Sequence, residues 1–180
     1  MKINGVHYRT VWMEESVVKM INQAILPHFF KIEELKTHQE TAQSIKDMIV
    51  RGAGAIGATA GFGMAQVVVE APDSSAFQDS IKAGARTLAH TRPTAQNLFY
   101  AIKRVKDAAE RASSVREARQ NAIEEAQAIA EEDVASCASI GCHGAALIKE
   151  GARVLTHCNA GWLAFVDWGS ALAPIYTAAR

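Results

Sequence analysis

Cysteine is scarce in this sequence, and the few that occur are not spaced like a disulfide framework. The 180 residues contain three cysteines, Cys137, Cys142 and Cys158. Small secreted scaffolds that rely on disulfides carry a denser and usually even set of cysteines. The sequence therefore argues against a disulfide-stabilised scaffold.

Net charge and long apolar runs are missing as well. Lys plus Arg number 19 and Asp plus Glu number 19, so the formal net charge is zero. This balance lacks the basic surface typical of nucleic-acid-binding proteins and a polybasic segment for a membrane surface. No apolar run reaches the roughly 18 to 20 residues that span a bilayer, and no signal-peptide core follows Met1–Gly5. We expect a soluble cytoplasmic protein with no nucleic-acid partner and no membrane partner.

Apolar residues are plentiful enough for a substantial core, since 49% of the sequence is hydrophobic. Near the start, the alternating residues of Val6–Met13 predict a strand. Ser16–Leu26 is interpreted as a short helix that stops at Pro27, and His28–Ile32 as a partner strand. These segments predict a small β element at the front of the chain.

Several helix starts follow, and most carry a capping signal. The pattern Ser or Thr, two residues, then Glu or Gln is a capping box that satisfies two free N–H groups at a helix start. Such signals predict helices from Thr37 to about Met48, from Ser75 to about Leu88, from near Thr91 with Pro93 in its first turn, and a long one from Ser114. The acidic residues placed on the solvent face of this long helix are Glu124, Glu125, Glu131, Glu132 and Asp133.

The composition changes near Gly151. We interpret Arg153–Cys158 as a short strand, Asn159–Gly161 as a turn, and Trp162–Ala179 as a helix kinked at Pro174. A lone strand-turn-helix unit cannot close a parallel sheet by itself. We therefore expect the sequence to stop inside a second domain, with residues 1–150 forming the first one.

The first candidate site is the glycine-rich stretch after Arg51. Gly52, Gly54 and Gly57 match the bare dinucleotide-binding pattern, but the preceding segment is predicted to be helical rather than extended, which argues against that function. The run of small residues suits a buried, tightly packed helix. An arginine beside such a helix start is suited to clamp a phosphate, because free N–H groups and a guanidinium both bind anions.

Arg92 is the second candidate, since it lies just ahead of Pro93 and could reach the anion that Arg51 binds. The alternative is an ordinary surface arginine beside a proline cap. The third candidate is Cys158, which the pattern places between a strand and a helix, where open α/β sheets bind ligands and a thiolate is favoured. A buried, unreactive cysteine is its alternative.

Cys137, Cys142 and His143 lie close together in the sequence and could suggest a metal site, but this is the weaker of two interpretations. The two cysteines are five residues apart within a predicted helix, which is a poor spacing for one helix face. We therefore interpret these three residues as core residues and expect no metal.

At these sites the sequence resembles the sugar-phosphate isomerase family that includes methylthioribose-1-phosphate isomerase, which is related to the initiation-factor 2B subunits. The resemblance runs over nearly the whole chain. Its segments, in order, are Ile21-Asn22-Gln23, Leu26-Pro27, Met48 to Ala53 with Ala55 to Gly57, Arg92-Pro93-Thr94-Ala95, Asn97-Leu98, Leu155 to Gly161 and Gly169 to Leu172.

The resemblance implies a mainly α N-terminal domain with a small β element (residues 1–150), followed by the first strand-turn-helix of a truncated Rossmann-like α/β domain (residues 151–180). It also implies conversion of 5-methylthioribose 1-phosphate to 5-methylthioribulose 1-phosphate in methionine salvage, without a cofactor. Members commonly form homodimers.

Roles for individual residues follow from the same resemblance. Arg51, Gly52 and Ala53 would hold the substrate, Arg92 would clamp its phosphate, and Cys158 would be the catalytic cysteine. Two features depart from the family. Gly54 stands where the family usually has proline, and the position of the family's catalytic aspartate lies beyond Arg180.

Two further functions stay open. One is an isomerase of another 1-phosphorylated pentose, such as 5-deoxyribose 1-phosphate or ribose 1,5-bisphosphate. The other is a non-catalytic regulatory or assembly protein like the initiation-factor relatives.

Overall fold

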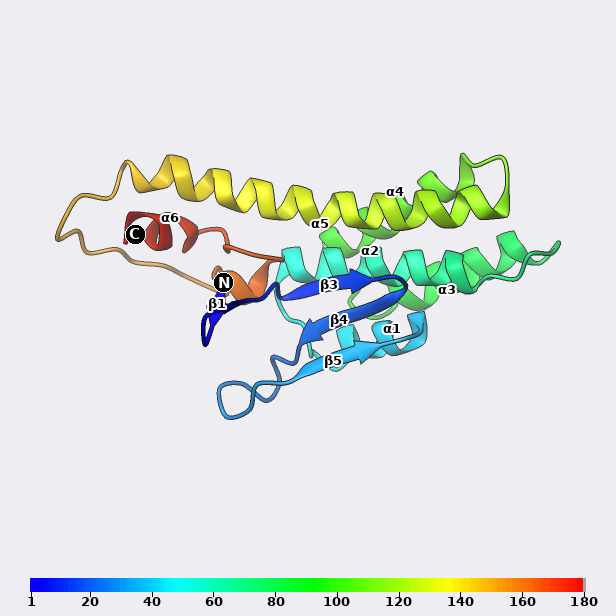
Figure 1. Ribbon diagram of the computed structural model, residues 1–180, viewed down its shortest axis with the longest axis horizontal. Helices are drawn as coiled ribbons and strands as arrows, with labels where there is room; N and C mark the ends of the chain where they lie inside the picture. The colour runs from blue at the N-terminus through cyan, green and yellow to red at the C-terminus, as the bar shows by residue number, and fades with distance from the viewer. Residues whose placement is uncertain (180) are drawn as a thin grey trace.

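Two small antiparallel sheets occupy the start of the chain in the computed structural model, which describes residues 1–179 (Figure 1). Strand β1 (Lys2–Ile3) pairs with β2 (Val6–His7) across a turn at Asn4 and Gly5. Both turn residues have positive φ, 51° and 82°. Asn and Gly adopt this conformation at low cost, and it matches the twist of a two-residue hairpin.

The second sheet has the order β3-β4-β5, with β3 at Val11–Glu14, β4 at Val17–Ile21 and β5 at Ile32–Leu35. Both neighbouring pairs are antiparallel. On the central strand β4, the alternate residues Val18 and Met20 are fully buried. This alternation fixes the register, because a slip by one residue would turn the apolar side chains outward.

The predicted helix at Ser16–Leu26 is wrong, because its first half is strand β4. The segment carries β-branched residues such as Val17 and Ile21, which fit a pleated, half-buried surface better than a helix. The predicted strand over Val6–Met13 is interrupted between β2 and β3, and the one predicted at His28–Ile32 begins only at its last residue.

The rest of the described chain is mainly helical, as the sequence predicted. The helices are α1 (His38–Lys46), α2 (Ala53–Glu70), α3 (Phe77–Ala89), α4 (Gln96–Glu110), α5 (Val115–Ala145), the 3-10 turn η1 (Trp162–Ala164) and α6 (Ala173–Ala178). Figure 1 shows α5 running along one long side of the molecule, with α2 beside it and the three-stranded sheet on the opposite side of α2.

Two of the predicted helix starts are confirmed by their hydrogen bonds. Thr37 accepts from the N–H of Glu40, and the Glu40 side chain accepts from the N–H of Thr37, so the capping box is complete. Ser114 accepts from the N–H of Glu117 and begins α5. In each case a local pattern was sufficient, because both partners lie within one turn.

Two other helix starts differ from the prediction. The predicted capping box at Ser75 does not form; α3 begins at Phe77 and its N-cap, Ala76, has no side-chain cap. Helix α4 begins at Gln96, so Pro93 lies in the turn before the helix rather than in its first turn.

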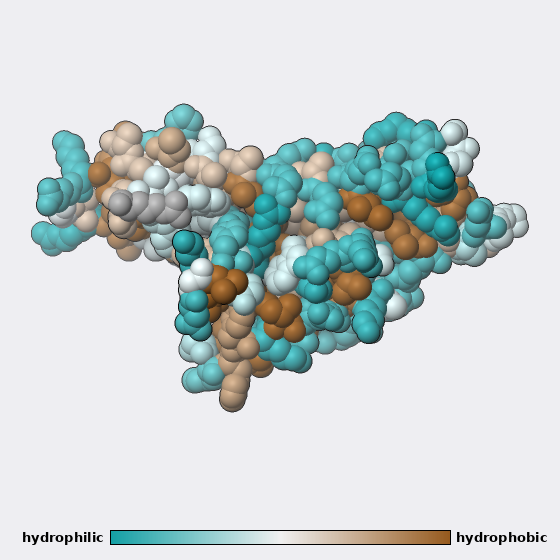
Figure 2. Space-filling view, viewed as in Figure 1, coloured by the Kyte–Doolittle hydropathy of each residue, from teal (hydrophilic) through white to brown (hydrophobic). Residues whose placement is uncertain are grey.

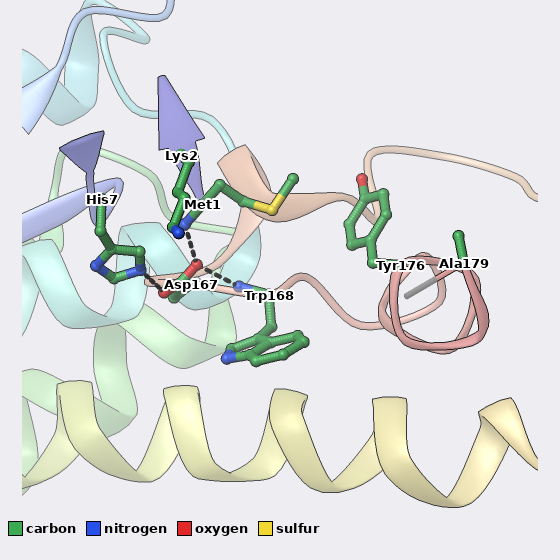
Figure 3. Close-up of a pocket in the computed structure, with 7 residues that line it drawn as sticks. All are labelled: Met1, Lys2, His7, Asp167, Trp168, Tyr176 and Ala179. Carbon is green, nitrogen blue, oxygen red and sulfur yellow. Dashed lines mark hydrogen bonds and ion pairs between the residues drawn. The ribbon is translucent and has the colours of Figure 1, made fainter. Parts of the chain in front are cut away.

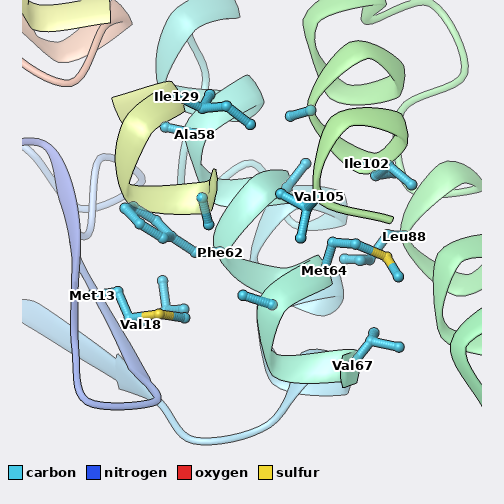
Figure 4. Packing of buried hydrophobic residues seen from close by; sticks show 14 of the residues in the cluster. Met13, Val18, Ala58, Phe62, Met64, Val67, Leu88, Ile102, Val105 and Ile129 are labelled. Atoms are coloured by element: carbon cyan, nitrogen blue, oxygen red, sulfur yellow. The ribbon is translucent and has the colours of Figure 1, made fainter. Parts of the chain in front are cut away.

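Helix α2 is the centre of the core, as the run of small residues predicted. Its residues from Gly54 to Val68 are all buried, and Phe62 and Met64 are among the largest fully buried side chains (Figure 4). A surface helix is apolar along one stripe only, whereas this helix is covered on every side. It packs against α1, α3, α4, α5 and strands β3 and β4.

Helices α2 and α4 run parallel with a constant register. A Cβ on Gly57 would lie 3.0 Å from the Cβ of Asn97, and one on Gly61 would lie 3.7 Å from the Cβ of Ala101. Each step of four residues along α2 is thus matched by four along α4. The small residues let the two helices approach closely, and the N-terminal ends of both lie at the same end of the molecule.

Helix α5 runs antiparallel to α2. Asp133 lies beside Gly54 near the start of α2, whereas Ile129 lies beside Gly61 farther along it. The first turn of α5 is therefore close to the C-terminal end of α2.

Residues 151–179 differ most from the sequence prediction. The predicted strand at Arg153–Cys158 is irregular and exposed. A strand needs a neighbour to satisfy its N–H and C=O groups, and no described residue pairs with this segment. The predicted helix at Trp162–Ala179 is divided into η1 and α6, and Pro174 lies in the first turn of α6 instead of kinking a longer helix. The boundary at residues 150 and 151 stays a prediction.

Candidate functional site

The N-terminus of α2 has no side-chain cap. Its N-cap is Gly52, which has no side chain to cap the helix, and the first turn contains no acidic residue. The first N–H groups of any α-helix have no partner within the helix, so they carry partial positive charge. Arg51 is exposed directly before them, and its Nε donates to the carbonyl oxygen of Met48 at 3.2 Å.

Arg92 lies at the same end of the molecule. It lies in the turn that leads into α4, and Asn97 in the first turn of α4 faces Gly57 near the start of α2. The Nη1 atom of Arg92 is buried and has no hydrogen-bond partner among residues 1–179. A buried donor without a partner costs free energy, so the guanidinium offers a free donor near the start of α2.

Cys158 has a different setting from the one predicted. It is exposed, it follows an irregular segment rather than a strand, and no helix N-terminus comes directly after it. Its φ is +68°, an uncommon conformation for a residue with a side chain. The expectation that Cys158 is buried is therefore wrong, and the expected position at a helix start is wrong too. No hydrogen bond between Cys158 and α2 is among those of the described residues.

The loop after Cys158 reaches the start of α2 at another residue. A Cβ on Gly52 would lie 2.0 Å from the Cα of Ala164, so only glycine fits this contact. The loop is tied to the N-terminal part of the chain, because the Thr10 hydroxyl donates to the Trp162 carbonyl and Gln23 Nε2 donates to the Leu163 carbonyl. The contact thereby links the region after the cysteine to the residues predicted to hold the substrate.

Asp133 was assigned to the solvent face of α5 from the sequence, and this assignment is wrong. Its Oδ2 accepts from the N–H of Val166 at 2.7 Å, and burial raises the pKa of its carboxyl group, which this hydrogen bond only partly offsets. Nothing local could have shown this, because the partner is 33 positions away. Of the other four acidic residues, Glu124, Glu131 and Glu132 are exposed and Glu125 is partly buried.

Asp167 is the second acidic residue that the sequence did not single out. Its carboxylate accepts from the Met1 amino group at 2.8 Å and from the N–H of Trp168 at 2.8 Å, and it lies 2.6 Å from His7 Nε2 (Figure 3). Burial alone would raise its pKa, but these partners outweigh burial and lower it. The group borders a hollow of about 700 Å³ that Tyr176 of α6 also lines.

The cluster at Cys137, Cys142 and His143 lies within α5, as expected. Cys137 is buried, and burial followed by the charges of Asp133 and Asp167 raises the pKa of its thiol to about 12. Cys142 and His143 are exposed, so only Cys137 is a core residue. Within residues 1–179 no three His, Cys, Asp or Glu side chains are grouped to hold a metal. No helix in the same part of the chain is long and apolar enough to cross a membrane.

Comparison with known proteins adds to this geometry. A model of the Initiation factor 2 subunit family matches residues 49–180. The chain belongs to this family. Among curated members with similar sequence, methylthioribose-1-phosphate isomerase of Methylorubrum populi is 47% identical over 187 residues, and that of Methylorubrum extorquens is 48% identical over 188. Each alignment covers 99% of this chain and 50% of the relative.

Solved structures of this family have the same fold. The 5-methylthioribose 1-phosphate isomerase of Pyrococcus horikoshii aligns with a TM-score of 0.87 and 40% identity, over 95% of this chain and 50% of that one. The translation initiation factor eIF-2B subunit delta of A. fulgidus aligns with a TM-score of 0.88 and 39% identity, over 96% of this chain and 51% of that one. The chain thus spans about half the length of the relatives that it matches. The resemblance and the mainly helical fold inferred from sequence are both confirmed.

Proposed function

We propose that this chain carries the phosphate-binding part of an aldose-ketose isomerase that converts 5-methylthioribose 1-phosphate to 5-methylthioribulose 1-phosphate in methionine salvage. The observation that carries the proposal is the uncapped start of α2, with Arg51 beside it and the free donor of Arg92 at the same end. The curated relatives named above as methylthioribose-1-phosphate isomerases support the choice of substrate.

Each residue has a chemical task in this proposal. Arg51, Gly52 and Ala53 hold the substrate through a guanidinium and backbone N–H groups, and Arg92 clamps the phosphate. The phosphate is on the anomeric carbon, so the ring must open with this ester in place before a hydrogen moves between C1 and C2. Fixed donors stabilise the phosphate and the developing oxyanion. The exposed thiol of Cys158 serves as an acid or base for the proton transfers.

Binding of methylthioribose 1-phosphate tests the phosphate site. Calorimetric titration of the chain should show binding that Arg51→Ala and Arg92→Ala each weaken by tenfold or more, about 1.4 kcal/mol. Arg116→Ala is the matched control, because Arg116 is exposed in the first turn of α5, at the far end of α2. Equal affinity in all three variants, or no binding by the wild-type chain, would contradict the site.

Turnover is tested separately, by NMR detection of the ketose product with Cys158→Ala as control. Conversion that disappears in the control supports a catalytic role for the cysteine within this chain. Binding without conversion means that this chain holds the substrate and that the chemistry needs residues outside it.

A non-catalytic regulatory or assembly function is the second candidate, and the likeness to the A. fulgidus initiation-factor subunit favours it. Its TM-score differs by only 0.01 from that of the isomerase structure, so the fold does not separate the two functions. Conversion of the substrate would exclude this candidate.

The nature of the substituent at the sugar 5-position is tested by a substrate panel. With methylthioribose 1-phosphate, 5-deoxyribose 1-phosphate and ribose 1,5-bisphosphate compared side by side, the proposal expects the first to bind most tightly. Tighter binding of either other sugar would reassign the substrate.

Assembly and location complete the proposal: a homodimer in the cytoplasm. All three cysteines are free thiols, which suits a reducing compartment. Sedimentation of the protein and fractionation of cells test these two statements.

A further inference from the structure

Asp133 lies where three parts of the molecule meet. It belongs to α5, its Oδ2 accepts from the backbone N–H of Val166 at 2.7 Å, and its Oδ1 faces Gly54 in the first turn of α2. A Cβ on Gly54 would lie 2.3 Å from this Oδ1 and 2.5 Å from Cδ1 of Phe165. The carboxylate therefore occupies the space that a side chain at Gly54 would need.

The hydrogen bond between Asp133 and Val166 holds a loop that contacts Gly52, the N-cap of α2. Ala164, two residues earlier in the same loop, packs against Gly52 with no room for a side chain between them. Thr10 and Gln23 tie the loop toward the N-terminal strands. Among the hydrogen bonds of residues 1–179, the one from Val166 to Asp133 is the bond that ties this loop to α5. Without it, no hydrogen bond of the described residues would join the loop to α5, although Ala164 would still pack against Gly52 and α6 against α5.

The surroundings of Asp133 make this bond strong. Asp133 is partly buried, and burial raises the pKa of its carboxyl group, with the Val166 N–H acting in the opposite direction. A hydrogen bond to a charged acceptor is stronger than one between neutral groups, and more so where water is excluded. The group also borders a small hollow of about 200 Å³ beside Gly54, Gly57 and Asn97.

We propose that Asp133 is a positioning residue for the anion site: by accepting from Val166 it holds the loop of residues 161–167 against Gly52 and so fixes the first-turn N–H groups of α2. Gly54 supplies the space for its carboxylate. The inference rests on the proposed function for the role of those N–H groups, whereas the positioning itself can be measured without any ligand.

The test compares Asp133→Ala with Asp133→Asn in the ¹⁵N-labelled chain. An asparagine side-chain oxygen can still accept from Val166, whereas alanine cannot. We expect Asp133→Ala to speed amide hydrogen exchange at Val166 by about tenfold or more, as loss of a charge-assisted hydrogen bond implies. The amide chemical shifts of residues 53–55 should also move, and Asp133→Asn should stay close to the wild type in both measurements. Glu124→Ala is the matched control, because Glu124 is exposed on the same helix and contacts Gln120.

Affinity for inorganic phosphate then connects the position to the site. Asp133→Ala should weaken phosphate binding by about tenfold, and Asp133→Asn should bind as the wild type does. A residue that only stabilises the fold would change the melting temperature without this difference in affinity. Unchanged hydrogen exchange at Val166 in Asp133→Ala overturns the proposal. Changed amide shifts at residues 53–55 without a loss of phosphate affinity overturn it as well. If the wild-type chain binds neither phosphate nor methylthioribose 1-phosphate, the proposed function fails. Exchange at Val166 and the amide shifts of residues 53–55 then still decide whether Asp133 positions the loop.

Gly54→Ala provides a second route if Asp133→Ala does not fold. The added methyl would displace the Asp133 carboxylate without removing it, and it would also press on the Phe165 ring beside Val166. Faster exchange at Val166 in this variant supports the inference, and exchange equal to the wild type contradicts it.

Discussion

Gly52 is the residue at which the loop after Cys158 comes closest to α2. A Cβ there would lie 2.0 Å from Cα and 2.2 Å from the carbonyl oxygen of Ala164, and both are backbone atoms that cannot rotate away. We predict that Gly52→Ala destabilises the fold by roughly 1 to 3 kcal/mol, the usual cost of overpacking. Urea unfolding of the two proteins, followed by circular dichroism, measures this difference.

Gly61→Ala is the matched control on the same helix. A Cβ there meets Ile129 Cδ1 at 3.5 Å, an ordinary van der Waals distance. Because alanine is favoured over glycine inside a helix, this variant should equal or exceed the wild-type stability, by up to about 1 kcal/mol. Equal destabilisation by both substitutions would show that Gly52 is not held against the loop.

The three cysteine thiols are predicted to react at very different rates. Cys142 and Cys158 are exposed, whereas Cys137 is buried and its thiol pKa is raised to about 12. Thiolate is the reactive form, so at pH 8 the native protein should show two fast thiols with Ellman's reagent. The third should react only on unfolding.

Cys137→Ala is the control for this titration, and it should leave the fast phase unchanged. A third fast thiol in the native wild type would contradict the burial of Cys137. Loss of one fast thiol in Cys158→Ala then identifies the candidate catalytic cysteine.

At the scale of single elements, capping determines where α1 begins. The Thr37 hydroxyl accepts from the Glu40 N–H at 3.2 Å. We predict that Thr37→Ala lowers the free energy of unfolding by about 1 kcal/mol, the usual loss for an N-cap. Thermal or urea unfolding measures it.

Ser75→Ala is a direct comparison, because Ser75 carries the same sequence pattern without making the cap. Its stability should match that of the wild type. A loss as large as that of Thr37→Ala would mean that Ser75 caps α3 in solution.

Elements differ in how far their own residues determine them. Helix α2 was predicted from its run of small residues, because such residues let neighbouring elements pack closely against a helix on every side. Strand β4 was not, because a short segment of β-branched residues becomes a strand only when another strand pairs with it, here β3 on one edge and β5 on the other. The predicted strand at residues 153–158 is the converse case, since it has a suitable pattern but no partner among the described residues.

At the scale of the whole molecule, the loop after α5 exposes large apolar side chains. Leu147 is 83% exposed and Leu155 is 97% exposed. Figure 1 shows this loop at one end of the molecule, and Figure 2 shows tan and brown residues among teal ones at that end. Exposed apolar patches promote association. We predict that the chain self-associates, and that the double substitution Leu147→Ser and Leu155→Ser increases the monomer fraction in sedimentation velocity.

Phe29→Ser is the control for this experiment. Phe29 is 69% exposed in the loop between β4 and β5, away from α5. Its replacement should leave the monomer fraction unchanged. A wild-type chain that stays monomeric at high concentration would contradict the predicted association.

The sequence alone determined the family, the mainly helical architecture, two helix caps and the buried glycine-rich helix. Each of these depends on residues close together in the chain, or on an ordered set of motifs. It also named Arg51, Gly52, Ala53, Arg92 and Cys158 as site residues, and their roles stay predictions.

Only the tertiary structure decided which distant residues meet. The parallel register of α2 and α4 brings Asn97 beside Gly57, and the antiparallel α5 carries Asp133 to the start of α2. No periodicity or spacing encodes such contacts, because they depend on how whole helices pack against one another. For the same reason the Asp133 carboxylate, which was expected to face water, is instead partly buried beside Gly54, where its pKa is raised.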